Sequence, residues 1–185
     1  MSSKDWNIQV VMASESDFTI IRNLVPYYVY DISEYTGWNC DVNGRWDGCE
    51  ELPDYWEQTN HHPYLITVND DVAGFVLIRP LPGELERREI GDFFVARKFK
   101  RTGVGSRSAY LAMDNHPGKW AVRVLDDNSG ALDFWSNAIH QYTGGVFTKT
   151  SEQFEDPHSG SWKMQIYRFD NFKRNAGVSH PGTQI

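Results

Sequence analysis

The sequence predicts one α/β domain built around a mixed β-sheet. Short apolar runs typical of strands are separated by segments in which apolar residues recur at helical spacing. The chain has 185 residues, 40% of them hydrophobic and 14% aromatic, which suits a single well-filled core. The predicted order is a strand, a helix, three strands, a helix, a strand, a helix and two strands.

Each predicted element follows from a local pattern. Strands are expected at residues 8–13, 64–68, 72–78, 89–95, 121–125, 142–150 and 161–169. Helices are expected at residues 18–25, 104–114 and 129–139. Ser14 and Asp17 supply the chemistry of a helix start before the first helix. Pro26 is expected to kink or restart that helix, which leads into YYVYDISEY.

Two stretches are expected to differ from this regular pattern. Residues 36–56 are rich in turn residues and tryptophan, which favours a loop with short helical pieces. Residues 171–185 are typical of a flexible tail. The folded domain is therefore predicted to span residues 1–170.

Composition excludes several classes of function. A formal net charge of -7 argues against nucleic acid as the main partner, because neutralising phosphates requires a basic surface. No apolar run is long enough to cross a bilayer, and MSSKDWNIQ lacks the layout of a secretion signal, so we expect a cytoplasmic protein without a membrane partner. Cys40 and Cys49 are expected to be reduced thiols, although a disulfide between them stays open. Their spacing to His61 and His62 matches no zinc motif, so no metal is expected.

Charge is unevenly distributed along the chain. Between residues 27 and 57 Arg45 is the only cation among many carboxylates, whereas residues 98–107 are almost purely basic. Two regions of opposite charge suggest two ligands of opposite charge. The alternative is that both regions are simply solvated surfaces.

The basic stretch FKRTGVGSRS places two glycines between a predicted strand and a predicted helix. Unpaired N–H groups at a helix start bind anions, and glycines let a phosphate approach them. A nucleotide-binding P-loop is excluded because its G-x-x-x-x-G-K-[ST] pattern is absent. A dinucleotide fold is disfavoured, because ARKFKRT separates the strand from Gly103 and too little chain remains for further parallel strands.

The segment VARKFKRTGVG resembles motif A of the GCN5-related N-acetyltransferases, the GNAT family, which has the pattern [QR]-x-x-G-x-[GA]. Lys100, Gly103 and Gly105 occupy its fixed positions, with lysine replacing the usual Gln or Arg. A second family pattern, N-x-x-A-x-x-F-Y, is matched by Asn128, Ala131, Phe134 and Trp135, followed by Gly144 and Gly145. The resemblance implies a sheet of about seven mostly antiparallel strands, flanked by helices and splayed between strands four and five. Within the family, EIGDFFV, HPGKWAVRVL and YTGG are similar to bacterial acetyltransferases of small molecules such as aminoglycosides.

The resemblance also implies how acetyl-CoA binds. The pyrophosphate would be wrapped by the backbone of Arg101, Thr102, Gly103, Val104, Gly105 and Ser106. Lys100, Arg101 and Arg107 would supply the countercharge. Phe94 and Val95 would pair their backbone with the pantetheine arm, as an added strand does. Asn128 and Trp135 would border the thiol end.

Acetyl transfer to an amine needs a base, because the ammonium must lose a proton before it attacks. Asp92 is the first candidate, on the face shared with Ile90 and Phe94 if the strand is regular, and Glu89 is the second. Each could equally be an exposed strand charge. Trp135 stands where the family has its proton-donating tyrosine, and an indole N–H does not release a proton near neutral pH. Tyr142, Ser136 or water would replace that acid, or the thiolate leaves unprotonated.

The acceptor is expected to bind to the acidic, aromatic front half of the chain. Carboxylates hold cations and flat rings stack on sugars or cations. The expected contacts are Asp31, Glu34, Trp38, Trp46, Tyr55 and Trp56. This chemistry favours a small polycationic amine, such as an aminoglycoside or a polyamine, over a protein lysine or N-terminus. A catalytically inactive acetyl-CoA sensor is the third possibility, and a homodimer is weakly expected.

Overall fold

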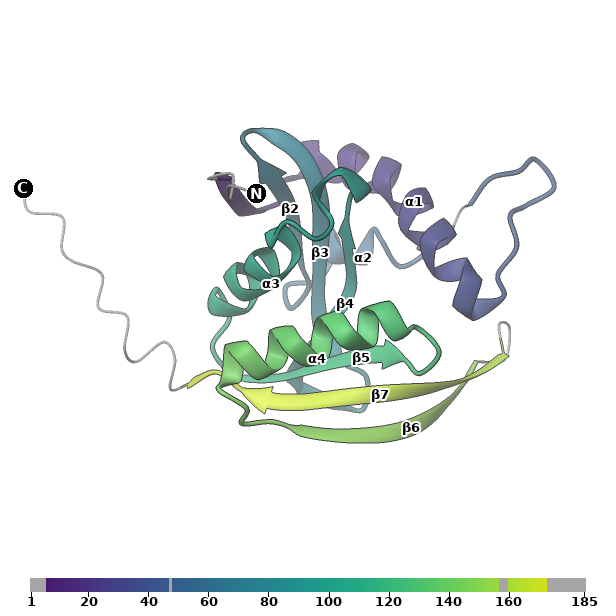
Figure 1. Cartoon of the computed structure of the whole chain (residues 1–185). Coiled ribbons are helices and arrows are strands. Elements are labelled where there is room, and N and C mark those ends of the chain that lie inside the picture. The colour runs from purple at the N-terminus through teal and green to yellow at the C-terminus, as the bar shows by residue number, and fades with distance from the viewer. Residues whose placement is uncertain (1–5, 47, 157–159, 173–185) are drawn as a thin grey trace, which may run out of the picture.

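The computed structural model describes residues 6–46, 48–156 and 160–172. A single mixed sheet, in the order β1-β2-β3-β4-β5-β7-β6, runs through the molecule, and α-helices cover it (Figure 1). Its strands are antiparallel except for the β4–β5 pair, which confirms the predicted fold class. The strands are β1 (Ile8–Met12), β2 (His62–Val68), β3 (Asp71–Leu81), β4 (Glu84–Val95), β5 (Lys119–Leu125), β6 (Thr148–Asp156) and β7 (Gly160–Asp170).

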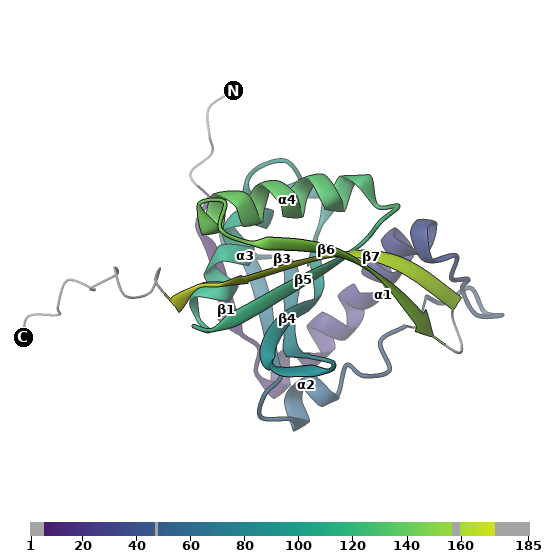
Figure 2. The same ribbon diagram turned by 90° about the horizontal axis from the view of Figure 1, so that it is seen from below.

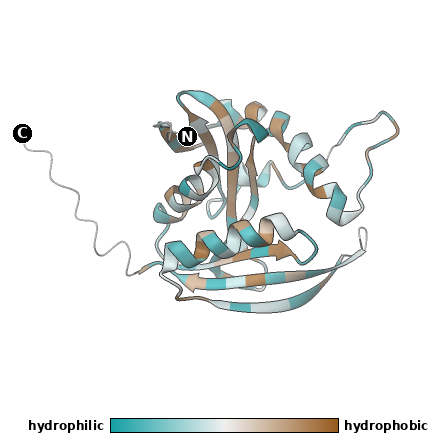
Figure 3. Cartoon of the chain, viewed as in Figure 1, coloured by the Kyte–Doolittle hydropathy of each residue, from teal (hydrophilic) through white to brown (hydrophobic). Residues whose placement is uncertain are grey.

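Helices lie on both faces of the sheet, as the view from below makes clear (Figure 2). On one face α3 (Val104–Asp114) and α4 (Ser129–Thr143) cover the larger core, which includes Trp120 and Tyr167. On the other face α1 (Phe18–Thr36) and α2 (Asp54–Glu57) cover a smaller core. The central strands carry the most hydrophobic residues (Figure 3). Burial of this apolar surface drives the assembly of the three layers.

Helix α1 runs without interruption through Pro26, so the expected restart of the helix at this proline is wrong. The alternative expectation, a kink at Pro26, stays a prediction. Proline lacks an N–H and therefore leaves the carbonyl of Arg22 without its usual helical donor. Packing compensates for this loss, since Ile21, Val25 and Val29 are buried along the inner stripe of the helix. The helix ends at Gly37, which adopts a left-handed conformation with φ 71°.

Several element boundaries differ from the sequence expectation, most clearly those of β4, α4 and β6. Strand β4 begins at Glu84 rather than at residue 89, because residues 82–83 form a tight turn that lets β3 and β4 pair directly. A strand is expected from residue 142, but α4 extends to Thr143. Gly144, with φ 64°, caps this helix. Strand β6 starts only at Thr148.

Strands β4 and β5 diverge after a short paired region. Their register runs from Arg87 opposite Lys119 to Ile90 opposite Val122 and ends there. Both strands continue beyond this point, β4 to Val95 and β5 to Leu125. The predicted splay between strands four and five is therefore confirmed.

The end of the described chain is held firmly at Asn171, which is 3% exposed. Its side chain accepts a hydrogen bond from the Gly118 N–H at 2.7 Å and donates to the Met113 carbonyl at 2.8 Å. Residues 173–185 of the predicted tail lie outside the described residues, so the tail and the domain boundary stay predictions. Among the helices described, none is long and apolar enough to cross a membrane.

Candidate active site

A β-bulge in β4 determines which side chains face each side of the sheet. Leu77 pairs with Asp92, while the next residue of β3 pairs with Ile90, so Gly91 is an extra residue in β4. Ile90 consequently packs in the core under α3 and α4, whereas Phe94 packs in the core under α1. Asp92 lies on the α1 side as well. The expectation that Asp92, Ile90 and Phe94 share a face is wrong, because it assumed a regular strand.

The turn before α3 presents a row of backbone N–H groups. Arg101 and Gly103 are in left-handed conformations, with φ 63° and 86°, and the first helical bond runs from the Arg107 N–H to the Gly103 carbonyl. Within the described residues nothing accepts a hydrogen bond from the N–H groups of Arg101, Thr102, Gly103, Val104, Gly105 and Ser106. Such a run of unpaired donors at the positive end of a helix dipole is an anion cradle.

The two glycines of this turn have different roles. Gly103 allows the left-handed conformation that starts α3, and its missing Cβ would meet no atom within 4 Å. A Cβ on Gly105 would lie 3.1 Å from the Phe134 ring, so this glycine lets α3 approach α4 closely. Only Gly103 shapes the cradle itself.

The basic side chains of this region divide into two groups. Lys100 Nζ lies 3.1 Å from Asp31 Oδ2, and Arg97 lies 2.7 Å from Asp31 Oδ1. Burial of Asp31 opposes ionisation, but hydrogen bonds from Arg97 and Lys100 outweigh it and lower the pKa of this carboxyl. Arg101 and Arg107 are exposed and form no ion pair with any described residue. They are the cations that are available to a bound phosphate.

The gap between β4 and β5 exposes backbone groups of β4. The Ala96 N–H bonds to the Ala73 carbonyl on β3, and N–H directions alternate along a strand. The N–H groups of Phe93 and Val95 therefore point away from β3, toward the gap. This agrees with the expectation for Val95, but the Phe94 N–H faces β3 instead. The gap can pair with an extended chain only through Phe93 and Val95.

Asp92 is a carboxylate of β4 that lies beyond the last β4–β5 pair, Ile90 opposite Val122. Burial is the largest influence on it and raises its pKa. A side-chain hydrogen bond from Tyr28 and the charge of Arg79 partly offset this rise. Such a carboxyl is a suitable base for an ammonium, because its conjugate acid holds a proton more readily than an exposed aspartic acid does.

Glu89 has a different environment, although it lies on the same face. It is 1% exposed and accepts hydrogen bonds from Arg79 Nε at 2.9 Å and from Arg123 Nε and Nη2 at 2.7 and 2.8 Å. Arg79 also pairs with Glu51. Both oxygens of Glu89 are thus occupied by guanidinium groups, and the geometry favours Asp92 as the base. The Glu89–Arg123 pair instead joins β4 to β5 where the strands diverge.

The α4 side of the gap is aromatic. The Trp135 ring, which is 7% exposed, contacts Phe93 and Phe134 at centroid distances of 5.2 and 4.9 Å. Asn128 caps α4, since its Oδ1 accepts the Ala131 N–H at 2.9 Å. Helix capping therefore accounts for the spacing between those two residues, and contact of Asn128 with a ligand stays a prediction.

The structure does not bring Tyr142 to the gap. Its hydroxyl donates to Asp114 Oδ1 at 2.8 Å and accepts from Asn171 Nδ2 at 3.1 Å. Asn171 binds Gly118, which precedes the first residue of β5, so this hydroxyl lies at the closed end of the β4–β5 pair. Tyr142 is correspondingly a structural residue between α3, α4 and the end of β7.

The six predicted acceptor contacts do not form one surface. Asp31 is engaged by Lys100 and Arg97, and Tyr55 is 2% exposed in the core. The Trp56 ring packs on Phe18, and its Nε1 donates to the Ser14 carbonyl at 2.9 Å. Partly exposed Trp38 and Trp46 contact Trp162 and Tyr30, and Glu34 is exposed. Tyr55 is buried and Asp31 is occupied by two cations, whereas Glu34, Trp38, Trp46 and Trp56 keep some exposed surface.

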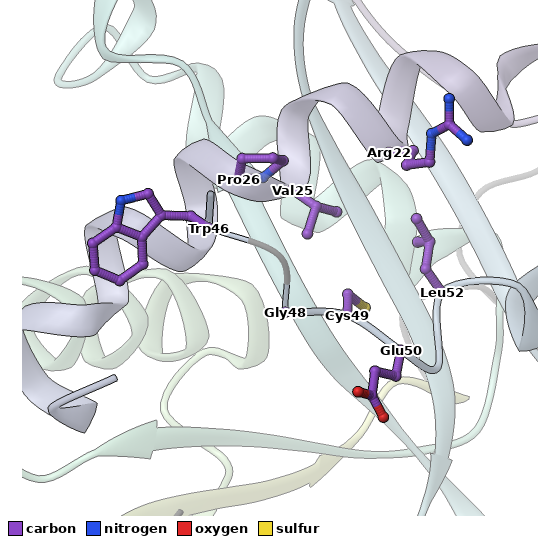
Figure 4. Close-up of a pocket in the computed structure, with 8 residues that line it drawn as sticks. All are labelled: Arg22, Val25, Pro26, Trp46, Gly48, Cys49, Glu50 and Leu52. Atoms are coloured by element: carbon purple, nitrogen blue, oxygen red, sulfur yellow. The ribbon is translucent and has the colours of Figure 1, made fainter. Parts of the chain in front are cut away.

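A pocket of about 220 Å³ lies between α1 and the segment around Cys49 (Figure 4). Val25, Leu52 and Cys49 point toward its interior, whereas the charged ends of Arg22 and Glu50 point away from it. Burial, followed by the charges of Asp92 and Glu51, raises the pKa of Cys49 to about 12. Both Cys40 and Cys49 are free thiols.

Sequence reasoning missed Tyr28, Arg79 and Cys49 around Asp92, and Arg123 beside Glu89. These residues come from α1, β3, the segment before α2 and β5, so only the folded chain brings them together. One signal was available, since a glycine inside a strand pattern, here Gly91, often marks a bulge. In the described part of the chain, no cluster of three or more metal-binding side chains is present.

The cradle and the open backbone of the gap define a site for a phosphate-bearing molecule with an extended arm, beside a carboxylate base. The sequence profile of the acetyltransferase (GNAT) family matches residues 29–138, more than half of the chain. The protein is a member of the GNAT family and an acetyl-CoA-dependent acetyltransferase. The residues of the cradle and of the gap fit the pyrophosphate and the pantetheine arm of acetyl-CoA, respectively.

Solved structures share this fold at low sequence identity. An N-acetyltransferase from Staphylococcus aureus Mu50 matches with TM-score 0.61 and 13% identity, over 89% of this chain and 98% of that one. The protein yncA from Salmonella typhimurium, solved with its cofactor acetyl-CoA, matches with TM-score 0.59 and 13% identity over 96% and 99%. The ribosomal-protein-S18-alanine N-acetyltransferase from Escherichia coli matches with TM-score 0.56 and 10% identity over 96% and 99%. None of the curated protein sequences matches this chain.

Proposed function

We propose that this enzyme transfers the acetyl group of acetyl-CoA to the amine of a small cationic acceptor, with Asp92 as the general base. The observation that carries the proposal is the position of Asp92, on β4 beyond its last pair with β5 and on the face covered by α1. Asp92 would take a proton from the acceptor ammonium, and the freed lone pair would attack the thioester carbonyl. A new C–N bond forms, the C–S bond breaks, and the remaining amine proton leaves with the product thiol or with water.

The backbone would support this step. An N–H directed into the gap, from Phe93 or Val95, can stabilise the negative oxygen that develops on the carbonyl. The unpaired amides of the cradle, with Arg101 and Arg107, would hold the pyrophosphate. Acetyl-CoA supplies the activated acyl group, and this chain supplies orientation, the base and a site shielded by the aromatic rings of α4.

For the acceptor we propose an aminoglycoside-type amino sugar or a polyamine. Support comes from the exposed carboxylates near the α1 face, Glu34 and Glu50, and from the rings of Trp38 and Trp46. The salt bridges of Asp31 remove one carboxylate from the originally expected set. A protein α-amine is the second candidate, because a structural neighbour acts on a ribosomal protein. The cytoplasmic location and a homodimer stay predictions.

The test is thiol release from acetyl-CoA with a panel of aminoglycosides, polyamines and N-terminal peptides. Release with a cationic small molecule, and its loss in Asp92→Asn, supports the proposal. Release with peptides alone would reassign the acceptor. Acetyl-CoA binding without release for any amine would favour a non-catalytic sensor. Calorimetric binding of acetyl-CoA, measured beside the assay, separates these outcomes.

A further inference from the structure

We infer that Asp31 competes with the phosphates of acetyl-CoA for Lys100 and Arg97, so that binding of acetyl-CoA releases the Asp31 carboxylate on α1. The inference rests on the proposed function, because it takes the phosphates of acetyl-CoA to bind at the cradle. It gives a reason why a residue expected to contact the acceptor is bonded to a residue expected to contact the cofactor.

The two ion pairs of Asp31 share one carboxylate. Arg97 Nη2 lies 2.7 Å from Oδ1, and Lys100 Nζ lies 3.1 Å from Oδ2. The side chain of Asp31 is 21% exposed, whereas those of Lys100 and Arg97 are 51% and 75% exposed. Both cations are therefore largely in solvent, and their long side chains can turn to another anion.

One short turn connects these cations to the cradle. Arg97 begins the 3₁₀ helix η2 (Arg97–Phe99), and the Lys100 N–H bonds to the Arg97 carbonyl at 3.2 Å. Lys100 immediately precedes Arg101, whose N–H is the first of the cradle. Phe99 is 2% exposed, and its carbonyl accepts a hydrogen bond from Thr102 Oγ1 at 2.6 Å, which fixes this backbone to the core. An exchange of partners thus needs only side-chain rotation, with the backbone of the cradle unchanged.

Charge decides the direction of this exchange. An ion pair between largely exposed groups contributes little to stability, since water screens it and ordering long side chains costs entropy. A phosphate offers several acceptor oxygens, and the unpaired N–H groups of the cradle favour a negative charge beside Lys100. Phosphate is consequently the stronger partner, and Asp31 weakens the binding of acetyl-CoA by the free energy of its own ion pairs.

The released carboxylate would add to the acidic surface of α1. Glu34 is exposed and lies three residues after Asp31, so the two side chains project from neighbouring positions of one helix face. Freed from its cations, Asp31 gives this surface a second negative charge. Binding of acetyl-CoA should therefore strengthen the binding of a cationic acceptor, and the acceptor should strengthen the binding of acetyl-CoA by the same factor.

Removal of the carboxylate tests the competition, because Asp31→Asn leaves Lys100 and Arg97 to the phosphates. We expect calorimetry to show that the Kd of CoA falls about three- to tenfold. Asp71→Asn is the matched control, since Asp71 pairs at 3.0 Å with Lys98 of the same turn. It removes an equal charge and should change the Kd of CoA by less than about twofold.

A second background separates direct competition from a general loss of negative charge. In a protein that carries Arg97→Met and Lys100→Met, Asp31→Asn should tighten CoA binding no more than Asp71→Asn does in the unsubstituted protein. Dephospho-CoA, which lacks the 3′-phosphate, identifies the phosphate involved. A gain from Asp31→Asn that persists with dephospho-CoA assigns the competition to the pyrophosphate, and a gain that disappears assigns it to the 3′-phosphate.

An unchanged Kd of CoA in Asp31→Asn, or an equal gain in Asp71→Asn, would overturn the inference. If Asp31→Asn does not fold, the Asp31 carboxyl of the unsubstituted protein is titrated by carbon-13 NMR with and without CoA. Burial raises the pKa of this carboxyl, but hydrogen bonds from Arg97 and Lys100 outweigh it and lower the pKa. Tyr35, one turn later on α1, stays neutral in this pH range. Loss of the two cations should therefore raise the pKa of Asp31, and a pKa that CoA leaves in place refutes the exchange.

Kinetics test the release of Asp31 toward the acceptor. With an active acceptor and saturating acetyl-CoA, Asp31→Asn should raise the KM of the acceptor about threefold or more, and an unchanged KM refutes the release. Tighter CoA binding to Asp31→Asn without acetyl transfer to any amine would reject the proposed function while leaving the competition established.

Discussion

Two carboxylates of β4, Glu89 and Asp92, should respond in opposite ways to replacement by their amides. Glu89 is 1% exposed and bonded to Arg79 and Arg123, so Glu89→Gln leaves two guanidinium groups without their shared countercharge. Breaking a buried ion pair from one side costs about 3–5 kcal/mol, and Arg79 keeps Glu51, so we expect a loss of about 3 kcal/mol in the free energy of unfolding. For a chain of this length that corresponds to a fall of about 6–12 °C in Tm.

Asp92→Asn should have little effect on stability, because burial of the charged carboxylate already opposes ionisation. We expect a change within about 1 kcal/mol, together with a fall in kcat/KM of at least about 100-fold. Urea unfolding and the thiol-release assay at saturating acetyl-CoA measure the two effects. The assignment would be refuted if Glu89→Gln kept full stability but lost activity while Asp92→Asn stayed active. Glu89 would then be the base.

Three further predictions concern the cradle, the histidines and α4. Gly103→Val should abolish the rise in Tm caused by acetyl-CoA, whereas Gly144→Val, which also replaces a left-handed glycine in open space, should lower Tm similarly but keep that rise. Burial, with smaller contributions from the positive charges of His62 and Arg88, lowers the pKa of His116 from 6.5 to about 4. The neutral ring therefore stabilises the fold above pH 6.5, and this stabilisation, at most about 3 kcal/mol, is lost as the pH falls toward 4. In urea unfolding at several pH values, the free energy of unfolding of His116→Gln should lack this pH-dependent contribution. A pH dependence equal to that of the unsubstituted protein would contradict the prediction. Trp135→Phe should leave the shape of the pH–rate profile intact, and loss of its alkaline limb would mean that the indole takes part in proton transfer.

Local patterns made the fold and the cradle predictable. The glycines before α3, the helical spacing after them and the alternating strands all depend on neighbours in sequence, and the splay followed from the family resemblance. The faces of β4 could not be predicted, because one extra residue at Gly91 reverses the direction of every side chain beyond it. The Lys100–Asp31 ion pair was equally hidden, since these residues are 69 positions apart and were expected to serve two different ligands.

The bulge also explains how one strand can serve both halves of the reaction. Asp92 and Phe93 are adjacent in sequence and project to opposite faces, so the base lies under α1 while the aromatic ring packs on Trp135 of α4. Tyr142 does not replace the family's acidic tyrosine, since it is bonded to Asp114 and Asn171 at the other end of the helix. A thiol has a pKa near 8.5, so its thiolate is stable enough to leave without an acid and to take its proton from water afterwards. In the proposed mechanism, proton transfer is thus concentrated on the acceptor side of the sheet, where Asp92 would accept the proton whose removal makes the amine a nucleophile.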